Sequence, residues 1–300
     1  MQFDEGSREM VTASKRPIMV GVDGSSSAEE AVRWAAAEAR VRRLPLSLVH
    51  AYPWAERMRR TGKPQPEVHD EELFRREAAE TLQQAGAQAR AAAPEIEIAT
   101  EVVDGRPVEV LTGRARGAEM VVLGSRGLGG VSGLLLGSVA VGLAAQASCP
   151  VVIVRGEVAA EGAPVVVGID DSAHNDAVLA FAYDYAALLG VELVVVRAWA
   201  DAVVDPVTAL VLDGDNIIEE ERRNVAEQLA GWREKYPDVA VRMHVILDRP
   251  AHALVEVSKG ARTVVVGSRG RGGMAGLLLG STSQALIHRS ACPVAVVRNP

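Results

Sequence analysis

The sequence has few cysteines, few aromatic residues and no long apolar run. Only two of its 300 residues are cysteines, Cys149 and Cys292, which excludes a disulfide-rich scaffold and a cysteine-based metal site. Each stands in a CPV triplet before an apolar run, so we interpret both as small buried residues in equivalent positions. No apolar stretch approaches the ~20 residues that a membrane-spanning helix needs, and we expect no membrane contact.

The chain also lacks a basic block and a secretion signal. Its net charge is −7, aromatic residues make up only 4%, and no basic stripe is interleaved with them, which excludes a typical nucleic-acid-binding surface. The start, MQFDEGSREMVTASK, lacks the basic segment and apolar centre of a signal peptide, so we expect a cytoplasmic protein. What the chain does have is a 48% apolar composition and a length that suits two core-forming domains.

The same sequence pattern occurs twice. PIMVGVDGSSS at 17–27 matches PVVVGIDDSAH at 164–174, and GSRGLGGVSGLLLGS at 124–138 matches GSRGRGGMAGLLLGS at 267–281. Such a duplication predicts two domains of one fold. The expected organisation is a polar tail over 1–15, a first domain over 16–155, a linker over 156–163 and a second domain over 164–300.

Short β-branched runs alternate with longer helical stretches in each copy. Runs such as MVVLG and TVVVG are apolar on both faces, which is typical of parallel strands covered by helices on both sides. Each copy is therefore predicted to be an α/β sandwich. Expected strands cover 17–22, 46–51, 96–103, 119–124, 150–155, 164–169, 191–198, 239–246, 262–267 and 293–298, and expected helices of the first copy cover 26–42, 67–92, 106–116 and 138–147.

The glycine-rich motif begins at the end of the fourth strand and stops where a helix begins. A strand, a glycine loop and a helix N-terminus together present backbone N–H groups and a positive dipole end to an anion. Gly124 and Gly127 allow close approach to a ligand, Gly137 allows the turn into the helix, and Ser138 either caps that helix or donates to a phosphate. The motif predicts a phosphate site; the alternative is a surface loop with an ordinary helix cap.

The motif is neither of the commoner nucleotide loops, because GxxxxGK[ST] is absent and no GxGxxG opens the first helix. It resembles, over nearly all of both copies, the ATP-binding tandem branch of the universal stress protein family. The features that carry the resemblance are VGVDGS after the first strand, G-x2-G-x9-G-S after the fourth, and CPVVIVR at the domain end. The resemblance implies two doubly wound, Rossmann-like, five-stranded parallel sheets of order 3-2-1-4-5, related by a pseudo-twofold axis.

That strand order implies a ligand crevice between the carboxyl ends of strands one and four. The resemblance places Asp23 and Asp170 near the ribose and phosphates of ATP, and makes the same two aspartates the expected metal residues, with Mg²⁺ between them and the phosphates. An aspartate in this place can instead cap the next helix, but Ser25 or Ser26 in the first copy and Ser172 in the second are competent caps that free it. The expected nucleotide-binding residues are Gly21, Asp23, Ala51, Gly124, Ser125, Arg126, Gly127, Gly137, Ser138, Val139, Gly168, Asp170, Ala198, Gly267, Ser268, Arg269, Gly270, Gly280, Ser281 and Thr282.

Several side chains near the expected sites have more than one possible role. Arg126 and Arg269 either contact phosphate or face solvent, while His50 suits a packed or pocket-lining role better than that of a base. The adenine is expected against the backbone at His50-Ala51 and Arg197-Ala198, as the resemblance implies. We interpret three tryptophans as core or interface residues: Trp34, Trp199 and Trp232.

The two copies differ in charge near the expected sites. Asp171 replaces Gly24, and a second carboxylate near phosphate predicts a weaker or more metal-dependent second site. The segment after the second strand is acidic in the second copy, whereas in the first it carries Arg57, Arg59, Arg60 and Lys63. This segment either covers the site, so that it favours phosphates in the first copy alone, or is a solvated variable loop.

The sequence contains neither a Ser/His/Asp set, an H-x-G-H motif nor a metal-ligand cluster. We therefore expect an ATP-binding stress-response regulator whose nucleotide state alters its contact with an unidentified protein partner. The alternatives are a slow Mg-dependent ATPase or nucleotidyl-transferring enzyme that uses Asp23 or Asp170, and a scaffold with non-functional loops. The apolar last strands are expected to pair antiparallel between the copies, and the resemblance implies a homodimer.

Overall fold

A computed structural model describes residues 15–54, 68–127, 137–157, 159–170, 172, 175–198, 214–270 and 279–298, with the backbone alone at 68–70 and 214–217. The strands of the first half are β1 (Ile18–Gly21), β2 (Leu46–Tyr52), β3 (Ile98–Asp104), β4 (Met120–Gly124) and β5 (Val151–Val154). Those of the second half are β6 (Val165–Ile169), β7 (Leu193–Ala198), β8 (Val241–Ile246), β9 (Thr263–Gly267) and β10 (Val294–Val297). All ten expected strands are thereby confirmed, with ends that differ by at most two residues.

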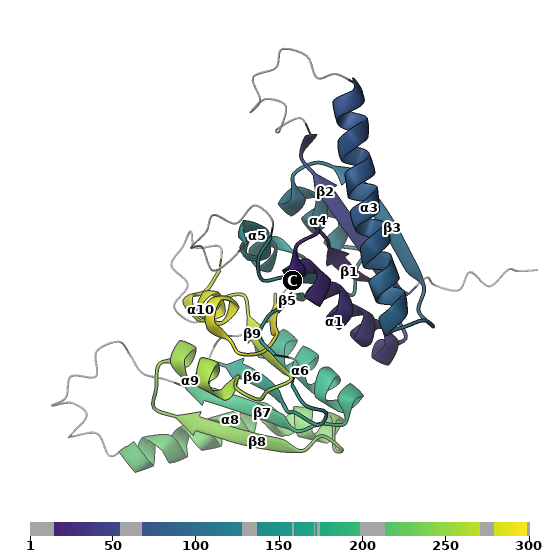
Figure 1. The fold of residues 1–300 in the computed structure, drawn as a ribbon. Helices are drawn as coiled ribbons and strands as arrows, with labels where there is room; N and C mark the ends of the chain where they lie inside the picture. The colour runs from purple at the N-terminus through teal and green to yellow at the C-terminus, as the bar shows by residue number, and fades with distance from the viewer. Residues whose placement is uncertain are drawn as a thin grey trace, which may run out of the picture.

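The strands form one sheet that runs through both halves (Figure 1). Its order is β3-β2-β1-β4-β5-β10-β9-β6-β7-β8, so each half has the expected order 3-2-1-4-5. Every pair within a half is parallel, whereas β5 and β10 pair antiparallel, with Val294 opposite Ile153 and Val296 opposite Val151. The antiparallel pairing of the last strands is confirmed, and it merges the two predicted five-stranded sheets into a single ten-stranded one.

Helices cover both faces of the sheet. Successive strand residues point to opposite faces, so Ile18 and Val20 enter one apolar cluster while Met19 enters the other. Trp34 is 8% exposed in the first cluster and Trp232 packs against it, as expected for core residues, while Trp199 lies outside the described residues. One face carries α1 (Ser26–Arg42), α3 (Val68–Ala92), α6 (Asn175–Leu189) and α8 (Gly214–Lys235), and the other carries α4 (Pro107–Ala115), α5 (Ser138–Gln146), α9 (Pro250–Val257) and α10 (Ser281–Arg289).

Local sequence explains where several of these helices begin. The hydroxyl of Ser25 accepts a hydrogen bond from the Ala28 N–H at 3.2 Å, which caps α1 as expected. Pro107 and Pro250 stand at the first position of α4 and α9, where a missing N–H costs nothing. None of the described helices is long and apolar enough to cross a bilayer.

Helices α1 and α6 meet beside the β5–β10 junction. Glu38 and Tyr185 occupy equivalent positions in the two copies, and the Tyr185 hydroxyl donates to Glu38 Oε1 at 2.5 Å. The carboxylate is 0% exposed and also contacts the guanidinium groups of Arg262, at 3.3 Å, and Arg42, at 3.5 Å. Burial raises the pKa of Tyr185, and the charge of Glu38 raises it further. The two halves are therefore joined by a buried polar contact as well as by the sheet.

The two cysteines are free and lie toward opposite ends of the β5–β10 ladder, because Cys149 precedes β5 and Cys292 precedes β10. Cys292 is buried, with 1% exposed, whereas Cys149 is half-buried. Burial raises the pKa of both thiols to about 11. At pH 8 only about one thiol in a thousand is then a thiolate, the reactive form.

We expect slow reaction of both thiols with Ellman's reagent at pH 8 in the folded chain. The rate should rise with pH toward 11 and should be at least about tenfold higher once guanidinium exposes the thiols at their ordinary pKa. The measurement is the absorbance of the released thionitrobenzoate against time. A fast phase in the native chain equal to one or two thiols would contradict the burial described above.

Candidate functional site

An aspartate and a glycine loop meet at the carboxyl edge of each half of the sheet. Asp23 follows β1 and the loop of Gly127 follows β4, and these two strands are paired side by side. A Cβ atom built on Gly127 would lie 2.5 Å from Asp23 Oδ2, and one built on Gly270 would lie 2.5 Å from Asp170 Oδ2. The predicted neighbourhood of aspartate and loop is therefore present in both halves, and each carboxylate lies directly against glycine backbone.

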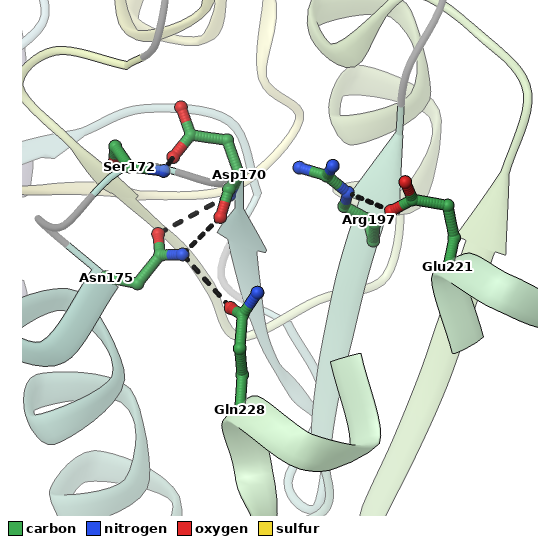
Figure 2. Close-up of polar contacts among 6 residues, drawn as sticks. All are labelled: Asp170, Ser172, Asn175, Arg197, Glu221 and Gln228. Atoms are coloured by element: carbon green, nitrogen blue, oxygen red, sulfur yellow. Dashed lines mark hydrogen bonds and ion pairs between the residues drawn. The ribbon is translucent and has the colours of Figure 1, made fainter. Parts of the chain in front are cut away.

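Each carboxylate is oriented by the residue two positions further on. Asp23 Oδ1 accepts hydrogen bonds from the Ser25 N–H at 3.0 Å and from the Ser25 hydroxyl at 2.7 Å. Asp170 Oδ1 accepts one from the Ser172 N–H at 2.8 Å, as Figure 2 shows. The second oxygen, Oδ2, is the one that faces the glycine. Both aspartates are thus fixed in direction by their own turns, and the N-cap of α1 is Ser25 rather than Asp23.

The helix that follows each glycine loop begins without a side-chain cap. Gly137 is the N-cap residue of α5 and Gly280 that of α10, and neither helix start receives a side-chain hydrogen bond. Because Ser138 is the first residue inside α5, the first of its two expected roles, the helix cap, is wrong, and the second, donation to a phosphate, stays a prediction. The backbone of Gly137, at φ −74° and ψ 135°, is also one that any residue can adopt, so the turn does not require glycine. The first-turn N–H groups, including those of Val139 and Thr282, have no helix carbonyl to bind.

Several loop amides are already used inside the protein. The Arg126 N–H donates to Ser27 Oγ at 3.2 Å, and the Gly137 N–H donates to the Ser125 carbonyl at 3.1 Å. In the second half the Ser268 N–H donates to the Val297 carbonyl at 2.9 Å, and the Gly280 N–H donates to that of Ser268 at 2.8 Å. An anion would therefore meet the first-turn amides of α5 and α10 rather than these four.

Three predicted site glycines have packing roles in the structure. A Cβ on Gly124 would lie 2.5 Å from the Ser27 carbonyl, so this glycine admits the backbone of α1. A Cβ on Gly21 would lie 2.6 Å from Leu123, and one on Gly168 would lie 2.7 Å from Leu254. Sequence reasoning assigned all three to the ligand. Gly267 has more room, since a Cβ there would be 3.1 Å from the nearest atom, the Arg269 carbonyl oxygen.

The ends of β2 and β7, where Ala51 and Ala198 pair with the neighbouring strands, differ between the halves. His50 is half-buried, and burial lowers its pKa while the charge of Asp23 opposes that effect, so the imidazole is neutral at pH 7. Arg197 occupies the equivalent position and is 2% exposed, with its Nε 2.8 Å from Glu221 Oε2 on α8 (Figure 2). The second half therefore carries a buried ion pair where the first carries a neutral ring.

Asn175, which sequence reasoning missed, holds the end of β6. Its Oδ1 accepts from the Asp170 N–H at 3.4 Å, and its Nδ2 donates both to the Asp170 carbonyl and to Gln228 Oε1, the latter at 3.3 Å (Figure 2). The first copy has Ala28 at the equivalent position. An amide that replaces alanine between two copies is a signal that a comparison of the copies can detect.

Arg126 and Arg269 are both exposed at their sites, as are Ser138 and Ser281 at the helix starts. No group of three metal-ligating side chains is found among the residues with described side chains. Asp171, the charged segments after β2 and β7, and the middle of each glycine loop at 128–136 and 271–278 lie outside the described residues. The predictions made for them stay predictions.

Comparison with known proteins gives the same family for both halves. The model of the universal stress protein family matches residues 15–155 and again residues 163–298. The chain belongs to the universal stress protein family. The universal stress protein Mb2028c of Mycobacterium bovis is 41% identical over 288 residues, a match that covers 94% of this chain and 96% of the relative.

Solved structures of universal stress proteins share the fold. The crystal structure of such a protein from Archaeoglobus fulgidus aligns with a TM-score of 0.71 at 21% identity, over 94% of this chain and 96% of that one. A second Archaeoglobus fulgidus structure, of a universal stress protein in complex with dAMP, is 27% identical with a TM-score of 0.35 and covers 47% of this chain and 99% of its own. The whole-chain match agrees with the tandem arrangement, since it spans both halves.

Proposed function

We propose that the chain binds ATP, one molecule in each of two domains that span 16–155 and 164–300, and acts as a nucleotide-dependent regulator. The observation that carries the proposal is the paired geometry of the site. In each half an aspartate oxygen lies against loop glycine backbone, beside a helix whose N-terminus has no side-chain cap. Both copies of the duplicated sequence have this arrangement.

The chemistry of the donors suits a polyphosphate. The N–H groups at Ser138, Val139 and their counterparts Ser281 and Thr282 point out of the helix start, where the dipole favours negative charge. Phosphates are therefore assigned to these amides, with Arg126 and Arg269 at the exposed rim.

The aspartates suit a different part of the ligand. Their carboxylates would repel phosphate but accept hydrogen bonds from ribose hydroxyls, so Asp23 and Asp170 are assigned to the ribose. Mg²⁺ would offset this repulsion wherever a phosphate oxygen comes close, because hard cations prefer such oxygen ligands. The adenine is assigned to the strand ends at Ala51 and Ala198, on the family resemblance stated above.

The proposed role is binding that changes an interaction, with a regulatory protein as partner and a cytoplasmic homodimer as the working form. The described part of the site presents main-chain donors, the exposed Arg126 and Arg269, and carboxylates that already accept hydrogen bonds from their own chain. This is an arrangement that holds a nucleotide in place. ATP would then act by stabilising one surface state of the protein over another.

The test is mass spectrometry of the nucleotide that the freshly purified chain releases on denaturation, with its molar ratio to protein. We expect intact ATP at a ratio between one and two; a ratio near two means equal sites, and a ratio near one means that Asp171 weakens the second. Asp23→Ala is expected to lower the ratio, and the exposed Asp238→Ala serves as control. No released nucleotide and no ATP binding by equilibrium dialysis would contradict the proposal, and steady phosphate release would favour the ATPase instead.

A further inference from the structure

Arg155 connects the end of the first domain to a helix of the second. It follows β5, and its Nη1 donates to the carbonyl oxygens of Leu286, at 3.3 Å, and Ile287, at 2.5 Å. Both carbonyls lie in the last turn of α10, where the helix dipole is negative and a cation is favoured. The guanidinium of one domain therefore holds the C-terminus of a helix whose N-terminus forms the other domain's site.

The contact has a counterpart in the other direction. Arg298 follows β10 and donates from Nη1 to the Gln146 carbonyl at 3.0 Å, at the last residue of α5. Because β5 and β10 are antiparallel, α5 and α10 each run from their own site toward the opposite edge of the sheet. Each nine-residue helix is thus about 14 Å long and spans the distance between its own site and the other domain's terminal arginine.

Arg155 lies beside the first site, because β5 pairs with β4 and Val154, the residue before Arg155, is opposite Gly124 at the start of the first glycine motif. Burial lowers its pKa, and the positive charge of Arg126, in the first glycine loop, lowers it further. Its Nε–H is buried and has no hydrogen-bond partner among the described residues. Two like charges at this place oppose one another until an anion lies nearby. A nucleotide phosphate at the loop of Arg126 would remove that opposition.

We propose that Arg155 is a positioning residue that couples the two sites, so that a nucleotide in the first site raises the affinity of the second through α10. The inference rests on the proposed function. A phosphate near Arg126 lets the Arg155 guanidinium bind the α10 carbonyls more strongly. This holds α10, and with it the first-turn amides at Ser281 and Thr282, in the position that receives the second nucleotide. By linkage, the second nucleotide raises the affinity of the first by the same factor.

The experiment is a calorimetric titration of the nucleotide-free full chain with ATP, at fixed salt and Mg²⁺. We expect positive cooperativity, with the second nucleotide bound about fivefold or more tightly than in a chain whose first site is silent. Arg155→Gln is expected to remove this cooperativity, and Arg155→Lys, which keeps a cation at the α10 carbonyls, to restore part of it. Arg116→Gln makes the same charge change at an exposed position and should leave the cooperativity intact.

A first-site variant, Gly127→Ala, separates coupling from a merely structural effect. In that background Arg155→Gln should change second-site affinity much less than in the unaltered chain. Independent binding at both sites, with Arg155→Gln equal to Arg116→Gln, would overturn the coupling and leave the proposed function standing. A chain that binds no ATP would overturn the proposed function, and the coupling with it.

Discussion

Replacing Gly127 by alanine is expected to weaken ATP binding mainly at the first site, with a smaller, coupled loss of affinity at the second. The added methyl group would lie 2.5 Å from Asp23 Oδ2, so either the carboxylate or the loop must move. Overpacking of this kind costs about 1–3 kcal/mol, and where the ATP-bound arrangement bears this cost it corresponds to roughly 5- to 150-fold in the dissociation constant. Gly270→Ala, against Asp170 Oδ2 at the same distance, should do the same to the second site. The measurement is the titration of each variant with ATP.

The matched control is Gly113→Ala, a change from glycine to alanine within α4. A Cβ atom there would meet nothing within 4 Å, so no group has to move. The control should bind ATP as the unaltered chain does and should gain up to about 1 kcal/mol of stability from helix propensity. If Gly127→Ala kept both sites at full affinity, the contact between loop and aspartate would have no part in binding.

Replacing Glu38 by alanine is expected to cause the largest loss of stability of any substitution considered. The change leaves the buried hydroxyl of Tyr185 without its acceptor and the guanidinium of Arg262 without its carboxylate partner. Removing one partner of a buried ionic contact costs about 3–5 kcal/mol. The measurement is the midpoint and slope of urea unfolding.

Two further variants make the Glu38 result specific. Tyr185→Phe keeps the carboxylate and its arginines, and should cost about 1–3 kcal/mol, the range for a buried group that loses its hydrogen bond. Glu30→Ala removes an exposed carboxylate from the same helix and should change stability by less than about 0.5 kcal/mol. Equal midpoints for Glu38→Ala and Glu30→Ala would show that the domain junction does not depend on this contact.

The strands could be predicted because their signal is local. Runs such as those of β4 and β9 carry apolar residues on both faces, and the structure buries both faces. The antiparallel junction could be predicted from two sources together: β5 and β10 are apolar and would otherwise form exposed edges, and the family resemblance implies both their edge position and their pairing. The order of strands within each half came instead from the family resemblance, since hydrophobic periodicity contains no information about neighbours.

Contacts between distant segments could not be predicted. Glu38 stands in a helix among charged residues and looks like part of a solvated face, yet partners more than a hundred residues away bury it. In the sequence, Arg155 is simply the last residue of an expected strand, and only the fold brings its side chain to the end of α10. The glycines show the same limit, because Gly124 and Gly127 look alike in the motif while one admits α1 and the other faces a carboxylate.

The antiparallel pairing of β5 with β10 also determines how a partner protein could contact the two carboxyl edges of the sheet. It turns the two binding edges away from one another, so one flat partner surface cannot cover both. A protein that recognises a filled edge would therefore meet one edge per chain, and a second molecule of it could dock on the opposite side. If the proposed function holds, a single polypeptide with this geometry would present two nucleotide-dependent surfaces on opposite sides of one sheet.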